Sequence, residues 1–137
     1  MIRCRLAVCA QSTVRDAESN QVSIFNILED VWASSFPLVF PSVHAVFMLT
    51  REDGDPGQPD FRLRVSQGRH GEDVVPINVN FEDKRRTRAL VRLEGLPIRA
   101  VGLVRFAILL DDQELGVWEI EAHQLEVSPP RVRTAPG

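Results

Sequence analysis

Tyrosine is absent from this 137-residue chain, and cysteine, methionine and tryptophan occur only twice each. Cys4 and Cys9 flank one short segment, which would have to fold back on itself to form a disulfide. We therefore expect two free thiols and a reducing, cytoplasmic environment. No apolar run approaches the ~18 residues that a membrane span needs. Arg3 and Arg5 interrupt the N-terminal apolar stretch, which argues against a secretory signal.

Lysine is nearly absent as well, since Lys84 is the single lysine among 16 basic residues. Together with 19 acidic residues, this gives a net charge of −3. Proteins that bind nucleic acid through their overall charge are basic, and single-strand binders interleave aromatic residues with basic ones. We therefore expect neither nucleic acid nor a membrane as a partner.

Helical periodicity is also scarce, and short segments of alternating apolar and polar residues dominate the chain. In the segments 61–66 (FRLRVS) and 87–94 (TRALVRLE), apolar residues recur at every second position. About eight such segments, separated by turns at a spacing of ~8–12 residues, predict an all-β fold. We expect residues 1–127 to form one antiparallel two-sheet sandwich, Ig-like or jelly-roll-like. Residues 128–137 are expected to form a proline-rich tail.

Local features predict the path of the chain. The polar stretch 11–21 is expected to be a loop. Pro76 should place segment 74–81 at a sheet edge, because proline cannot donate to a central ladder. Asn26 is expected to adopt a left-handed bulge that bends the chain, so that segment 21–35 serves both sheets.

The register of the last hairpin is predicted from its apolar pattern. A three-residue loop at 112–114 sets Phe106 opposite Ile120 on the inner face and Arg105 opposite Glu121 on the outer face. Every inward-facing pair is then apolar, whereas a two-residue loop mixes the two faces. The pattern therefore favours the three-residue loop.

Two segments resemble an uncharacterised bacterial domain family of unknown function. NQVSIFNILEDVWASSFP (20–37) is similar to its signature strand and the Ser-Phe-Pro that follows, although Asn26 stands where glycine is common. FAILLDDQELG (106–116) resembles its closing hairpin, with Asp112-Gln113 in place of the usual Asp-Gly. The resemblance implies a small cytosolic β-sandwich, and it supplies no catalytic residues.

No catalytic motif stands out in the chain. The histidines are His44, His70 and His123, and none lies in a G-x-S-x-G or H-E-x-x-H motif. Glu119, Glu121 and His123 share one strand face, but we interpret it as a solvated face on which Arg105 pairs with Glu121. We therefore expect no catalytic residues, no metal site and no cofactor.

Outward-facing arginines are the strongest remaining feature. Arg62, Arg64, Arg88 and Arg92 point outward from two predicted strands, and they form one basic stripe if the strands share a sheet. The alternative is cross-strand pairing with the acidic residues Glu82, Glu94 or Glu119. Arginine binds carboxylates bidentately and is enriched at interfaces.

We therefore predict a non-enzymatic module for protein interaction or assembly, whose partner is another protein or a second copy bound through these four arginines. A sandwich that binds a small ligand or a carbohydrate is the alternative. That alternative predicts a pocket lined by aromatic residues such as Trp32, Phe36 and Phe40.

Overall fold

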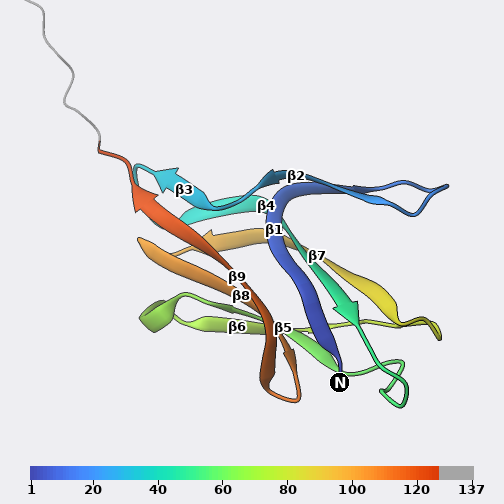
Figure 1. Cartoon of the computed structure of the whole chain (residues 1–137). Helices are drawn as coiled ribbons and strands as arrows, with labels where there is room; N and C mark the ends of the chain where they lie inside the picture. The colour runs from blue at the N-terminus through green and yellow to red at the C-terminus, as the bar shows by residue number, and fades with distance from the viewer. Residues whose placement is uncertain (127–137) are drawn as a thin grey trace, which may run out of the picture.

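The computed structural model describes residues 1–126, which form nine strands in two sheets. The strands are β1 (Arg3–Arg15), β2 (Val22–Ile27), β3 (Asp30–Ala33), β4 (Leu38–Thr50), β5 (Phe61–Ser66), β6 (Glu72–Ile77), β7 (Arg86–Ile98), β8 (Gly102–Leu110) and β9 (Gln113–Gln124). The four-stranded sheet has the order β2-β1-β4-β7 and the five-stranded sheet the order β3-β9-β8-β5-β6 (Figure 1). A 3-10 turn, η1 (Gly68–His70), links β5 to β6. The predicted all-β sandwich is confirmed, with nine strands instead of about eight.

One apolar core fills the space between the two sheets. Phe47 and Leu49 of β4 face Phe106 and Ile108 of β8 across it, and each is at most 1% exposed. Successive residues of a strand point to opposite faces, so the same alternation turns the arginines of β5 and β7 outward. Among residues 1–126, no helix is long and apolar enough to cross a membrane.

The chain passes from one sheet to the other just after Asn26. This residue has a φ of 56°, in the left-handed region that asparagine tolerates better than branched residues do. β2 then ends, and β3 joins the other sheet beside β9. The prediction that one segment serves both sheets is confirmed. The predicted bulge is wrong, because the β1–β2 register continues unshifted past Asn26.

Two expectations about strand arrangement need correction. Residues 11–15 belong to β1, so the predicted loop at 11–21 is a strand end followed by a turn. Both faces of this hairpin are largely exposed, and alternation therefore does not mark it. β3 pairs with β9 in parallel, an exception to the antiparallel arrangement. The predicted tail, 128–137, lies outside the described residues.

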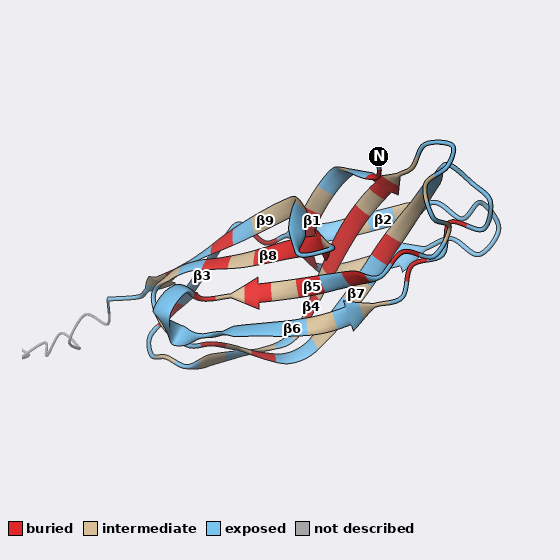
Figure 2. Cartoon of the chain, turned by 90° about the horizontal axis from the view of Figure 1, so that it is seen from below, coloured by how far each residue is buried: buried red, intermediate tan, exposed pale blue. Residues whose placement is uncertain are grey.

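β6 is an edge strand, as Pro76 predicted. It runs along the border of the five-stranded sheet and is mostly exposed (Figure 2). Its only strand neighbour among the described residues is β5, which pairs Arg62 with Pro76. A proline is tolerated here because no further strand needs its missing backbone N–H.

The last hairpin turns through two residues, not three. Asp111 and Asp112 have φ angles of 50° and 63°, the signature of a type I′ turn. Leu110 pairs directly with Gln113 on the other side of the turn. The preference for the three-residue loop is therefore wrong.

A register shift in β8 and β9 then restores the alternation that the two-residue turn disturbs. Beyond the shift, Phe106 faces Trp118 and Arg105 faces Glu119, each two residues earlier in β9 than predicted. Because a two-residue offset preserves the face of every side chain, the predicted inner and outer faces are still correct. Glu121, however, no longer lies opposite Arg105.

Candidate functional site

A cleft of about 730 Å³ opens at one end of the four-stranded sheet. There the β1–β2 hairpin and the segment leading into β7 extend toward the same end of the molecule (Figure 1). Met48 of β4, which pairs with Arg88, and Leu90 of β7 contribute apolar surface to the lining. The cleft is thus formed by strands that are distant in sequence and joined through β4.

Five basic side chains line this cationic cleft, against the single acidic residue Glu82. They are Arg5, Arg15, Lys84, Arg86 and Arg88. Within residues 1–126, none of the five has a carboxylate within 4.0 Å. A chain with a net charge of −3 therefore carries a local concentration of uncompensated positive charge.

The turn of the β1–β2 hairpin is held against β7 by arginine. The Arg88 guanidinium donates to the backbone oxygen of Asn20 at 2.7 Å, and Arg15 donates to the Asn20 side chain at 3.1 Å. Asp16 accepts the backbone N–H groups of Ser19 and Glu18, which lower the pKa of its carboxyl group. The turn is therefore ordered by its own hydrogen bonds, and two cations point from it and from β7 into one cleft.

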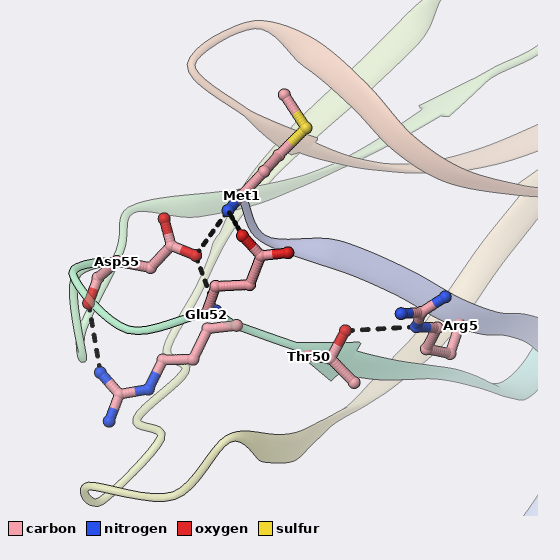
Figure 3. A network of polar contacts seen from close by, with 6 residues as sticks. Met1, Arg5, Thr50, Glu52 and Asp55 are labelled. Carbon is pink, nitrogen blue, oxygen red and sulfur yellow. Dashed lines mark hydrogen bonds and ion pairs between the residues drawn. The ribbon is translucent and has the colours of Figure 1, made fainter.

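Arg5 closes another side of the cleft, at the register shift between β1 and β4. Its Nε donates to Thr50 Oγ1 at 3.3 Å (Figure 3). The carboxylates of Glu52 and Asp55 in the adjoining loop are instead bonded to the Met1 ammonium group, at 3.0 and 2.9 Å. These bonds raise the pKa of the ammonium group, and the two acids leave the charge of Arg5 uncompensated.

The structure separates the four predicted binding arginines into two pairs. Arg62 and Arg64 lie on β5 of the five-stranded sheet, whereas Arg88 and Arg92 lie on β7 of the four-stranded sheet. The basic stripe predicted for strands of one sheet is therefore not formed. Arg88 alone among the four lines the cationic cleft.

Two of the four arginines, Arg64 and Arg92, form ion pairs with acidic side chains. Arg64 pairs with Glu114, which Arg105 also contacts at 2.9 Å. Arg105 and Arg64 together hold the pKa of Glu114 below its ordinary value. Arg92 pairs with Glu94 at 3.1 Å, but both residues lie on β7, so this is not the cross-strand pair that the alternative predicted. The partner of Arg64, Glu114, is not among the acids named from the sequence.

Sequence reasoning missed most of the cleft. The run KRRTR (84–88) contains three of its cations, and this run is the signal that was available. Arg5 and Arg15 had no comparable signal, because their segment joins the cleft only through the pairing of β1 with β4. Arg85, within the same run, is directed to Asp53 at 3.4 Å and is not part of the lining.

The three aromatic residues expected to line a ligand pocket, Trp32, Phe36 and Phe40, do not line the cationic cleft. Phe36 and Phe40 are half-buried against the core, and Trp32 is 58% exposed. His44 lies on β4 and shares a hydrogen bond of 2.9 Å with Thr13. His123 lies on β9 of the five-stranded sheet, so these two histidines belong to different sheets.

Fold and site together define a two-sheet β-sandwich domain with a cationic cleft. The chain belongs to a family of unknown function (DUF6941), whose profile matches residues 5–123. This range contains both segments, 20–37 and 106–116, on which the resemblance to an uncharacterised family rests. That expectation is confirmed.

Solved structures similar to this chain include a β-glucosidase from Listeria innocua, in complex with glucose and with isofagomine. The sequence identity is 10% and the TM-score 0.42 in both cases. The match covers 69% and 73% of this chain but only 15% of the enzyme's chain. A likeness this weak carries no argument about function. No curated protein matches the chain.

Proposed function

We propose that this protein is a non-enzymatic interaction module that binds an acidic segment of a partner protein in the cationic cleft. The observation that carries the proposal is the set of five cations that line the cleft without a carboxylate partner within residues 1–126. The two free thiols support a cytoplasmic setting, where cysteines stay reduced.

The cleft has the mixed chemistry of a protein interface. Its guanidinium groups offer planar, bidentate donors to carboxylates. Leu90, 43% exposed, and Met48 of the adjoining strand β4 offer apolar contact in the lining. Interfaces typically combine arginine with an apolar centre, so a segment that carries both acidic and apolar side chains complements this surface.

Electrostatics strengthens the argument for an acidic partner. Like charges gathered in a cleft repel one another, and an incoming carboxylate relieves that repulsion. A cleft lined by one sign of charge also speeds the association of an oppositely charged partner. The five cations of the cleft form a local patch on a chain with a net charge of −3, which favours a short acidic segment over an extended polyanion such as DNA.

A small anionic ligand is the second candidate. The volume of about 730 Å³ supports it, because pockets for small molecules span about 300–1,000 Å³. A carboxylate- or phosphate-bearing molecule fits the lining better than a neutral carbohydrate, since the cations outnumber the one aromatic side chain there, Phe81.

Binding of a fluorescent peptide of aspartate, glutamate and leucine, measured by anisotropy, tests the proposal. The double variant Arg86→Glu/Arg88→Glu should weaken binding at least tenfold. Arg62→Glu is the control, because Arg62 lies on the other sheet and outside the cleft. An equal loss in both variants, or no binding by the native protein, would contradict the proposal.

Two further measurements distinguish the possible ligands of the cationic cleft. Citrate or inorganic phosphate that displaces the peptide at micromolar concentration favours the small-ligand candidate. Elution above 15.4 kDa on a sizing column, abolished by Arg88→Glu, identifies a second copy of the chain as the partner. Melting curves of every variant establish that each one is folded.

A further inference from the structure

A second cluster of polar side chains lies on the five-stranded sheet, where β3 runs parallel to β9. The register sets Asp30 beside Glu121 and Trp32 beside His123. Asp30, Glu121 and His123 each offer one ligand atom, and these atoms lie within 4.8 Å of one another. Two carboxylates and an imidazole from two hydrogen-bonded strands thus converge on one point.

We propose that Asp30, Glu121 and His123 form a binding site for a divalent first-row cation, with Zn²⁺ as the best-matched ion. Carboxylate oxygen and imidazole nitrogen bind Zn²⁺ at about 2.0–2.2 Å, which sets tetrahedral ligand atoms roughly 3.4 Å apart. His123 Nε2 and Asp30 Oδ1 are already 2.7 Å apart, so small side-chain rotations create the site. Three protein ligands leave a fourth position for water.

Contacts within the protein orient the His123 imidazole without a bound ion. The Trp32 ring stacks on the His123 ring at a centroid distance of 4.2 Å and an interplanar angle of 18°. This contact restricts rotation of the imidazole and keeps Nε2 directed at Asp30. Ligands held on rigid, paired strands lose less freedom on binding than ligands on a loop do.

The neighbouring arginine does not neutralise the carboxylates of this cluster. Arg105, the cation that the sequence placed opposite Glu121, instead contacts Glu114 and Glu119 at 2.9 and 3.5 Å. Glu121 faces Leu103 on that side. Within residues 1–126, His123 is the only ion-pair partner of either carboxylate of the cluster. The reason for expecting no metal site therefore does not hold in the observed register.

Calorimetric titration of the untagged, metal-free protein with Zn²⁺ tests the proposal. The native protein should bind one equivalent, with a change in tryptophan fluorescence because Trp32 stacks on a ligand. Asp30→Asn and His123→Gln should each weaken Zn²⁺ binding at least tenfold. Glu119→Gln, an exposed carboxylate of the same strand outside the cluster, is the matched control and should leave the affinity unchanged.

Zn²⁺ binding weaker than about 1 mM in the native protein overturns the proposal. So does an affinity that Asp30→Asn and His123→Gln leave unchanged, or one that Glu119→Gln weakens equally. Circular dichroism checks that each variant is folded, and Glu121→Gln supplies the same test if another variant is not. The outcome is independent of the cationic cleft, which lies on the other sheet.

Discussion

Gly116 marks a close approach of the two sheets, and replacing it with alanine provides a direct test of the packing. A Cβ atom added at this position of β9 would lie 2.5 Å from the Cys4 sulfur and 3.0 Å from the Cys4 Cβ of β1. Carbon atoms in contact are ordinarily about 3.5–4.0 Å apart. The Cys4 sulfur would have to rotate away, and β1 and β9 would have to separate by about 0.5 Å to bring the two Cβ atoms to ordinary contact.

The expected cost follows from overpacking. Forcing an extra carbon into a packed site typically costs about 1–3 kcal/mol, so Gly116→Ala should reduce the free energy of unfolding by about that amount. With a urea m value of about 2 kcal/mol/M, a loss of about 2 kcal/mol lowers the unfolding midpoint by about 1 M. Gly57→Ala is the control, because its added Cβ meets only the flexible end of Arg51, at 3.4 Å.

A second substitution isolates the clash. Cys4→Ala removes the sulfur that the new Cβ meets, so it should recover part of the stability in the Gly116→Ala background. The two changes should then be non-additive by about 0.5–2 kcal/mol, as expected for residues in contact. Additive effects in urea titrations, or Gly116→Ala as stable as Gly57→Ala, would refute the close-approach argument.

Four further outcomes are expected. Phe106→Ala should cost about 3–5 kcal/mol of unfolding free energy and Arg105→Ala under about 1 kcal/mol; the opposite order in urea titrations would contradict the assigned faces. Asn26→Gly should be tolerated within about 1 kcal/mol and Asn26→Val should cost more; equal melting temperatures would remove the support for this. A thiol reagent should label Cys4 first and Cys9 only on unfolding, because Cys9 is fully buried and burial raises its pKa well above the ordinary range; early labelling of both would count against the packing. EDTA should leave the β-sheet circular dichroism signal intact, because the core needs no metal to fold; its loss would show the reverse.

The sequence predicted the local features of the fold well. Alternation in 61–66 and 87–94 predicted two strands and the inward or outward direction of their side chains, because one face of each meets the core. Asn26 predicted the left-handed residue before the change of sheet. The alternation and the asparagine can both be read from a few consecutive residues, without knowledge of which strands pair.

Pairing between distant strands was not predictable in this way. Nothing local to Arg64 or Arg88 distinguishes one shared sheet from two opposed sheets, because both strands alternate equally well. The cations of the cleft lie up to 83 positions apart in the sequence, from Arg5 to Arg88, and they meet because β4 lies between β1 and β7. Asp30 and His123 meet for a similar reason, through a parallel pairing that leaves no pattern in either strand.

The parallel pairing of β3 with β9 also shapes the order in which the chain can fold. β9 lies between β3 and β8, so the five-stranded sheet is incomplete until residues 113–124 have been synthesised. The β8–β9 hairpin closes quickly through its short turn, whereas the contact between Asp30 and Glu121 closes a loop of most of the chain. Such long-range contacts slow folding, and β-rich domains dominated by them fold in milliseconds to seconds. Until then β3 and β8 have open edges, which exposes the nascent chain to pairing with other strands.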